Sequence, residues 1–337
     1  MINYADVIVD LQAGDTGKGK VAHALLENSS YTHVIRYNGG GNAGHTIYHN
    51  GKKLVTHFIP CGVMYGIKSI IGPGCVVHPC KLFEEIKKLE DAGIDVKSNL
   101  YIDKRVHVIT DNHLEDDGKD SKIGTTKQGI GPVYRDKYGR VGLRAENCNE
   151  LSEFIFDIYD LHIFGENKIL FEGAQGFELD IDWGDYPYVT SSHCTVGSAV
   201  LNGVPPQKIK TIYGIAKAYC TYVGAKKFEP SSSSFSVFDK IREIGNEYGS
   251  TTGRERQINW INLHSLVKAI NINGVTDLII NKLDVMEKVG VFKIKMGDED
   301  ILKFNDSLEF KNFIDIFIRN NCPTIEKIIF SVTPFGI

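Results

Sequence analysis

The chain has 337 residues, of which 42% are hydrophobic and 24% are charged, so it can bury a sizeable core in one large domain or two. Its formal net charge of −4 argues against a protein that coats nucleic acid or an anionic membrane. The seven cysteines form no CxxC pair, so we expect reduced, buried thiols in a cytoplasmic protein. We expect no signal peptide and no membrane span, because no apolar run is long enough.

Apolar runs typical of buried strands alternate with helical segments along the chain. The first strand is expected at residues 7–11, and a helix is expected to start at residues 21–26. Residues 79–92 are predicted to be helical, because Pro79 lies near the start and Gly93 follows the end. This alternation predicts an α/β fold with a mostly parallel central sheet covered by helices, in a single domain over residues 1–337. Further strands are expected at residues 33–37, 69–72, 168–171, 210–215, 277–280 and 327–330.

One long segment breaks this alternation. Residues 111–142 are polar, rich in glycine and poor in helical pattern. The segment is too long for a plain connection between two elements, so we expect it to be a functional loop region that is poor in helix.

The first apolar run leads into the glycine-rich loop at residues 14–20, which has the spacing G-x-x-x-x-G-K. Backbone N–H groups in such a loop, followed by a helix, form a cradle for phosphate. An ordinary P-loop carries Ser or Thr after the lysine to bind magnesium, but this chain has Val21. Asp15 offers a carboxylate instead, which could bind magnesium or accept a proton. A surface turn of glycine and lysine is the alternative interpretation.

Three further loops have a similar composition. Residues 38–46 hold four glycines and end on His45, which could act as an acid beside a phosphate or could simply be a packing residue. Residues 250–256 combine hydroxyl groups with two arginines, which suit a carboxylate or a phosphate, although a solvated charged turn is the alternative. Residues 123–132 have the same character. Together the four loops predict a site for several anionic substrates.

In chain order, these loops and later segments resemble the adenylosuccinate synthetase family over nearly the whole chain. Each motif is a moderate signal by itself, and their occurrence together in family order is a strong one. The matching segments are GDTGKGK at 14–20, GGNAGHT at 40–46, IGTT at 123–126, GIGP at 129–132, FEGAQG at 171–176, YPYVTSS at 186–192, GNEYGSTTGR at 245–254 and KLD at 282–284.

The resemblance implies a ligase that depends on Mg²⁺ and a nucleoside triphosphate. The triphosphate phosphorylates the 6-oxygen of a purine monophosphate, and the amine of L-aspartate then displaces that phosphate. By resemblance, Asp15 is the base for the purine N1 proton and a magnesium ligand, and His45 is the acid that stabilises the transferring phosphoryl group. Lys18 would neutralise phosphates, and the carbonyl of Gly44 would complete the magnesium shell.

The other site residues are likewise implied by the resemblance. Arg140 would reach the nucleotide phosphate of a neighbouring subunit, which implies a homodimer. Asn42, Thr126, Arg140, Gln175, Thr190 and Val223 would bind the purine nucleotide; Ser250, Thr251, Thr252, Arg254 and Arg256 would bind aspartate; Thr16, Gly17, Gly19, Lys20, Gly44, Thr46, Lys282 and Asp284 would bind the triphosphate.

Departures from the family pattern fall where bases are selected. Ala13 and Thr16 stand where the family has Trp and Glu, which leaves room for a purine with a 2-amino group. This pattern favours the viral branch of the family, which uses dGMP with ATP or dATP and makes 2-amino-2′-deoxy-N6-succinyladenylate in the host cytoplasm. The alternative is an enzyme of IMP and GTP, and Asp284 suits guanine. Other departures are Gly41, Gln128, Tyr222 and residues 226–230.

Two hypotheses from other classes stay open at this stage. A P-loop kinase or NTPase would share the first loop, but Val21 counts against it. A nucleotide-binding regulator without activity would be expected to lose Asp15 or His45, and both are present.

Overall fold

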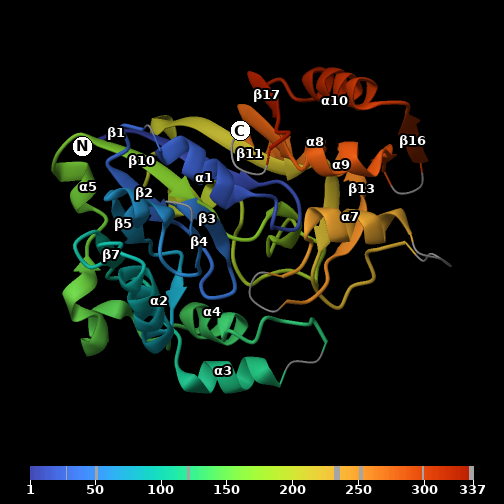
Figure 1. Cartoon of the computed structure of the whole chain (residues 1–337). Helices are drawn as coiled ribbons and strands as arrows, with labels where there is room; N and C mark the ends of the chain where they lie inside the picture. The colour runs from blue at the N-terminus through green and yellow to red at the C-terminus, as the bar shows by residue number, and fades with distance from the viewer. Residues whose placement is uncertain are drawn as a thin grey trace.

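The computed structural model of the chain describes residues 1–27, 29–49, 52–119, 122–230, 236–249, 253–297 and 300–333. A nine-stranded sheet in the order β17-β14-β11-β1-β10-β2-β5-β7-β9 runs through the molecule (Figure 1), and its neighbouring strands pair in parallel. The α/β prediction is thereby confirmed. The strands are β1 (Ile2–Asp10), β2 (His33–Arg36), β5 (Lys68–Ile71), β7 (Leu100–Asp103), β9 (Ile155–Phe156), β10 (Asn167–Glu172), β11 (Ile209–Lys217), β14 (Asp277–Asn281) and β17 (Lys327–Phe330).

The central strands are buried on both faces, as expected for a parallel sheet between helices. Successive side chains point to opposite faces, so Val7 and Val9 of β1 lie in one core cluster while Ile8 lies in the other. This burial explains why the strands are near-continuous apolar runs that the sequence predicts well.

Helices cover the two faces of the sheet. The cluster with Ile8 also holds buried residues of α1 (Lys18–Leu26) and α2 (Pro79–Asp91). The cluster with Val7 and Val9 holds residues of α8 (Leu263–Asn273) and α10 (Ser307–Asn321). The shorter helices are α5 (Asp160–Ile163), α6 (Gly197–Leu201), α7 (Val237–Gly245), α9 (Leu283–Val289), and the 3-10 helices η1 (Cys61–Tyr65), η2 (Ala145–Asn147), η3 (Asn149–Phe154), η4 (Phe177–Leu179) and η5 (Pro206–Lys208).

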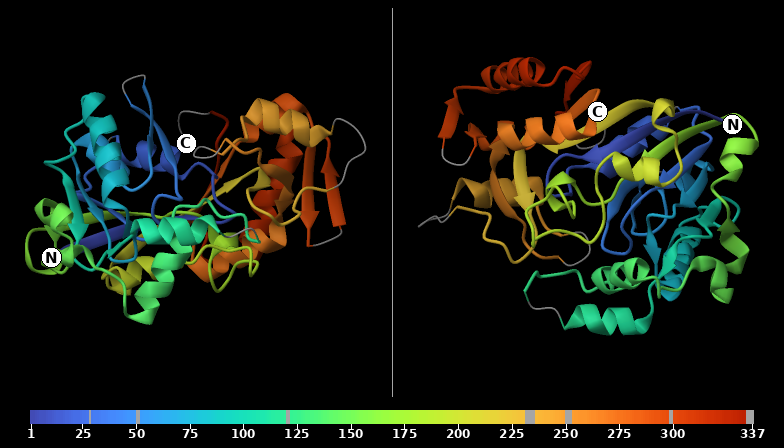
Figure 2. Two further views of the ribbon diagram at one scale, coloured as in Figure 1. Left: turned by 90° about the horizontal axis from the view of Figure 1, so that it is seen from below. Right: turned by 180° about the vertical axis from the view of Figure 1, so that it is seen from behind.

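Smaller sheets flank the large one. A four-stranded mixed sheet has the order β12-β13-β15-β16, a hairpin joins β3 to β4, and β6 pairs with β8. Figure 2 shows the orange and red C-terminal elements at one end of the molecule and the blue and cyan N-terminal elements at the other. The strands are β3 (His45–His49), β4 (Lys52–Thr56), β6 (Val76–Val77), β8 (His107–Val108), β12 (Tyr219–Tyr222), β13 (Gln257–Asn262), β15 (Phe292–Met296) and β16 (Asp300–Phe304).

The prediction of a helix-poor loop at residues 111–142 is wrong. Helix α3 (Asp111–Gly118) begins with a capping box between Thr110 and His113, and α4 (Ile130–Gly139) begins after Gly129, whose N–H donates to the carboxylate of Asp117 at 2.8 Å. Ile130, Val133 and Tyr134 pack with Val76 and Ile109 in a third core cluster. Packing against the rest of the fold, which local glycine content does not report, therefore stabilises these helices.

Among the described residues, all seven cysteines are free thiols and only Cys80 is exposed, as the sequence predicts. A search of the same residues finds no helix long and apolar enough to cross a membrane.

Candidate active site

A cavity of about 460 Å³ lies at the loops that follow the central strands β1, β2 and β10. The carboxyl ends of parallel strands meet at one edge of a sheet, where ligand sites of α/β proteins form. Eleven of the predicted site residues line it: Asp15, Lys18, Asn42, Gly44, His45, Thr126, Gln175, Thr190, Val223, Arg254 and Arg256.

The first loop presents Asp15 to this cavity in a strained backbone conformation. Asp15 has φ of 55° between Gly14 at 88° and Gly17 at 101°, in the left-handed region that residues with a side chain seldom adopt. Such strain persists where surrounding structure enforces it, often at functional sites. Its carboxylate Oδ2 lies 2.9 Å from Nη2 of Arg256, so the loop that follows β1 meets the loop before β13.

Asp10, at the end of β1, holds the first loop in place. Its Oδ2 accepts hydrogen bonds from Nζ of Lys18 at 2.7 Å and from Oγ1 of Thr16 at 2.5 Å. Lys18 also donates to the carbonyl of Gln175 at 2.7 Å. The ammonium of Lys18 is therefore already paired, and the hydroxyl of Thr16 faces Asp10 and does not line the cavity. Asp10 was not among the predicted site residues, although its place just before the loop is a signal.

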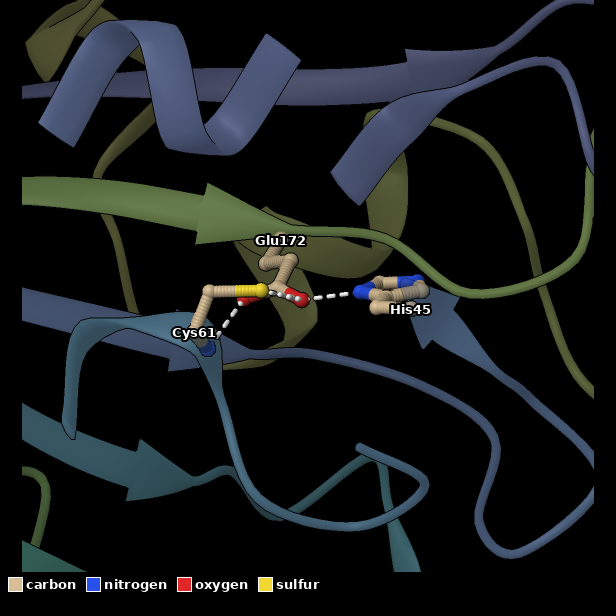
Figure 3. Close-up of side chains that lie close together, drawn as sticks. All are labelled: His45, Cys61 and Glu172. Carbon is tan, nitrogen blue, oxygen red and sulfur yellow. Dashed lines mark hydrogen bonds and ion pairs between the residues drawn. The ribbon is translucent and has the colours of Figure 1, made fainter. Parts of the chain in front are cut away.

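His45 is oriented by a buried carboxylate (Figure 3). Its Nδ1 contacts Oε1 of Glu172, at the end of β10. Glu172 also accepts the backbone N–H of Cys61 at 2.9 Å and its thiol at 3.1 Å. His45 Nε2 is buried and has no hydrogen-bond partner within the described part of the chain, although the residue lines the cavity. That nitrogen is therefore available to a ligand.

The charges around His45 set its protonation. Burial lowers the pKa of His45, the carboxylate of Glu172 opposes this shift, and the guanidinium of Arg36 adds to it. Burial alone would raise the pKa of Glu172, but His45, Arg36 and the N–H of Cys61 hold it at about 2. We infer an ionised Glu172 beside an imidazole that donates from Nδ1. A proton on Nε2 then requires the imidazolium form.

A second buried charge network fixes Arg256. Glu247 accepts from Nη1 of Arg256, from Nζ of Lys217 at 3.1 Å and from the hydroxyl of Tyr219 at 2.6 Å. Burial alone would raise the pKa of Glu247, yet Lys217 and Arg256 bring it to about 2. Arg256 thus bridges Glu247 and Asp15 and is held rigidly in the cavity wall. No role was predicted for Lys217 or Glu247, which are distant from Asp15 in the chain, although Glu247 lies in the matched segment 245–254.

Several predicted purine-binding residues share the same cavity. The side-chain amide of Gln175 is buried without a partner among the described residues, and its backbone is in the left-handed region at φ 54°. A buried amide that lacks partners is suited to bind a polar ligand. Asn42 is locally held, since its Oδ1 accepts the N–H of Gly40 at 3.1 Å. Cavity-lining residues that the sequence did not single out include Asp116, Asp117, Arg135, Leu179 and Tyr188.

The predicted triphosphate residues other than Gly44 gather outside this cavity. Nζ of Lys20 donates to Oγ of Ser331 and to the carbonyl of Thr333, both at 2.6 Å. Burial lowers the pKa of Lys20 to about 8, although the nearby Asp284 opposes the shift and Lys282 adds to it. The first loop therefore meets the segment after β14 and the segment after β17. Thr16, Gly17, Gly19, Lys20, Thr46, Lys282 and Asp284 do not line the cavity.

The remaining predicted residues lie apart from the cavity or outside the described part of the chain. Arg140 follows α4, is exposed and does not line the cavity. Ser250, Thr251 and Thr252, predicted to bind aspartate, lie outside the described residues. Arg254 lines the cavity and donates to the carbonyl of Thr125 at 3.1 Å.

The cavity contains oxygen ligands of the kind that Mg²⁺ prefers. Asp15 supplies a carboxylate, and Gly44, which lines the same cavity, supplies a backbone carbonyl. The chemistry of these two groups therefore suits the magnesium ion that the sequence predicts.

Comparisons with known proteins agree with this arrangement. A family model described as adenylosuccinate synthetase matches residues 7–162 and 148–303. Adenylosuccinate synthetases from Thermodesulfovibrio yellowstonii and Listeria welshimeri are 40% and 39% identical, over 86% and 90% of this chain and 80% and 83% of theirs. The structure of fully ligated adenylosuccinate synthetase from Plasmodium falciparum has a TM-score of 0.83 at 29% identity and covers 98% of both chains.

A more distant structure shares the fold. Cyanophage S-2L succinoaminodeoxyadenylate synthetase, bound to dGMP and dATP, has a TM-score of 0.78 at 20% identity and covers 99% of this chain and 94% of that one. The relatives of 39–40% identity carry the assignment. The chain belongs to the adenylosuccinate synthetase family of ligases, which form a carbon–nitrogen bond using Mg²⁺ and a nucleoside triphosphate.

Proposed function

We propose that the chain joins L-aspartate to the 6-position of IMP, with GTP as the phosphate donor. The observation that carries the proposal is that Asp15, His45, Gln175 and Arg256 all line one cavity. Nε2 of His45 and the side-chain amide of Gln175 have no hydrogen-bond partner among the described residues. Relatives of 39–40% identity named adenylosuccinate synthetase support IMP better than the dGMP assignment predicted from sequence.

The predicted residues of the cavity then act in two successive steps, phosphorylation of the purine and displacement of the phosphate by aspartate. The Asp15 carboxylate takes the purine N1 proton, which makes the 6-oxygen a nucleophile toward the γ-phosphate. His45, protonated on Nε2, donates to the phosphoryl oxygen where negative charge develops. Bound Mg²⁺, held by Asp15 and Gly44, would neutralise phosphate charge. Aspartate then displaces the 6-phosphate while Arg254 and Arg256, with residues 250–252, hold its carboxylates.

The donor nucleotide binds beside the active-site cavity, at Lys20, Lys282 and Asp284. An Asp284 carboxylate accepts both the N1–H and the amino group of guanine, which supports GTP over ATP. Lys20 supplies a positive charge from the first loop, near this group.

We also propose a homodimer in which Arg140 enters the partner's active site. Near Arg140 in the chain, Tyr138 and Val141 are 67% and 77% exposed. Leu143 is also exposed. Exposed apolar groups clustered around an arginine are typical of a protein interface.

A second candidate is dGMP as acceptor with ATP or dATP as donor. Its support is Ala13, a methyl-sized residue in the cavity wall that leaves space where the family pattern has Trp. Thr16 gives it less support than the sequence suggested, because its hydroxyl bonds to Asp10.

Substrate assays separate the two candidates. With Mg²⁺ and L-aspartate, we expect kcat/KM for IMP with GTP to exceed that for dGMP with ATP or dATP by at least about tenfold, a difference of ~1.4 kcal/mol in transition-state binding. Product formation is followed by absorbance and chromatography. Turnover of dGMP but not IMP would establish the second candidate. Phosphate release that does not require aspartate would indicate a plain NTPase.

Glu172→Gln is expected to move the basic limb of the pH–rate profile to lower pH. The carboxylate raises the pKa of His45 against burial, so its removal lowers that pKa further. The protonated fraction of His45 at a given pH falls, and activity is lost earlier as pH rises. We expect this limb to lie at lower pH than in the wild type, measured as kcat against pH.

Glu85→Gln is the matched control. Glu85 is also a buried carboxylate, which accepts backbone N–H groups of His57 and Ile59 at 2.9 and 3.0 Å, but no hydrogen bond or ion pair joins it to His45. This variant should lose stability, but the basic limb of its pH–rate profile should stay where it is in the wild type. An equal shift in both variants would mean that Glu172 has only a structural role.

A further inference from the structure

A second cavity of about 510 Å³ adjoins the active-site cavity. Ala13, Tyr188 and Tyr222 line both cavities. The remaining wall comes from η4, the loop after it, β12 and the segment after it, β13, α8 and β15. It includes none of the residues assigned to the ligase reaction. The cavity is large enough for a ligand of nucleotide size.

Positive charge dominates this second cavity. Four lysines line it, and Lys226 is paired with Asp185. Lys227, Lys268 and Lys295 have no carboxylate partner among the described residues. The only other acid in the wall is Glu178. Burial and the neighbouring acids raise the pKa of Glu178 to about 7. The wall therefore carries an excess of positive charge that favours an anion.

Aromatic rings form the rest of the wall. Phe177 and Trp183 stack with centroids 6.4 Å apart, and Nζ of Lys268 lies 5.8 and 5.6 Å from their centroids. Trp183 lines the cavity and is 45% exposed, so part of its indole ring is accessible to a ligand. Trp260 and Phe228 line the same cavity. Aromatic faces beside lysines suit a planar base joined to a phosphate.

We propose that this second cavity is a binding site for a nucleoside monophosphate, separate from the acceptor and donor sites of the ligase reaction. The base stacks on Trp183, and the phosphate binds Lys268 and Lys295. The proposal does not depend on which purine is the acceptor.

The tryptophans allow a specific test with AMP as the probe. The chain has only two, Trp183 and Trp260, and both line this cavity. With IMP saturating, we expect AMP to change tryptophan fluorescence saturably and equilibrium dialysis to find one AMP per chain. Adenosine and inorganic phosphate should bind at least about tenfold more weakly, since each lacks one half of the recognised chemistry. Loss of AMP binding in saturating IMP would place AMP in the active-site cavity and overturn the proposal.

Matched variants complete the experiment. Lys268→Gln combined with Lys295→Gln should weaken AMP binding at least tenfold and leave kcat with IMP unchanged. Lys303→Gln is the control, because Lys303 is an exposed lysine on β16 that lines neither cavity. Trp183→Phe should retain AMP binding by dialysis, whereas Trp183→Ala should lose it. Wild-type AMP affinity in the double lysine variant, or in Trp183→Ala, would overturn the proposal.

Discussion

Asp15→Asn is expected to lower kcat by roughly 10³-fold, within the usual range for loss of a general base. Asparagine keeps the size of the side chain, but it cannot take the purine N1 proton and is a weaker magnesium ligand. The fold should persist, because Arg256 retains Glu247 when its contact with Asp15 is weakened. Steady-state kinetics at saturating substrates measures the effect.

Isotope exchange shows which step fails in this variant. With GTP labelled at the β–γ bridge by ¹⁸O, the wild type should scramble the label in the presence of IMP, and Asp15→Asn should not. Asp300→Asn, an exposed carboxylate on β16, is the control and should scramble normally. Near-normal kcat in Asp15→Asn would rule out its role as the base.

Replacement of His45 should lower kcat nearly as much as Asp15→Asn does. Two substitutions distinguish the roles of its Nδ1 and Nε2 atoms. His45→Asn leaves a donor near the position of Nδ1 for Glu172 and removes Nε2, which faces the ligand. We expect kcat to fall by about 10²- to 10³-fold, because the developing charge on the phosphoryl group loses its donor. Thermal unfolding should show only a modest loss of stability, because Glu172 keeps a partner.

His45→Gln reverses the arrangement by placing an amide near the position of Nε2. It should recover part of the activity relative to His45→Asn, by about tenfold. Equal kcat values for the two variants and the wild type would exclude a catalytic role for Nε2. A large loss of stability in His45→Asn, with little loss of kcat, would indicate that His45 serves packing alone.

The sequence predicted the central strands and the first loop well because both depend on neighbouring residues. Residues 7–11 and 277–280 are apolar runs that a parallel sheet buries on both faces, and β1 and β14 occupy them. Helix α2 was equally clear, since its proline and glycine mark its ends. The helices α3 and α4 were missed because glycines and hydroxyl residues around them masked a short apolar stripe, which only packing stabilises.

The candidate catalytic residues could be proposed from motifs, but the partners that lie far away in the chain could not. Glu172 lies 127 residues from His45 in the chain. The two meet because the last residue of β10 lies beside the first residue of β3. Asp10 accepts a hydrogen bond from the hydroxyl of Thr16. Thr16 is therefore less informative about the purine substrate than its place in the loop suggested. The second cavity joins η4, α8 and β15, which no motif links.

The sequence by itself determined most strands of the central sheet, helix α2, the glycine-rich loops and the family of this protein. Those properties depend on apolar spacing, on backbone freedom at glycine and on residue order, which act over short distances. The tertiary structure decided which carboxylate orients His45, which backbone carbonyl accepts a hydrogen bond from Lys18 and where a second cavity lies. Those contacts depend on strand order in the sheet, which brings together residues more than 100 positions apart.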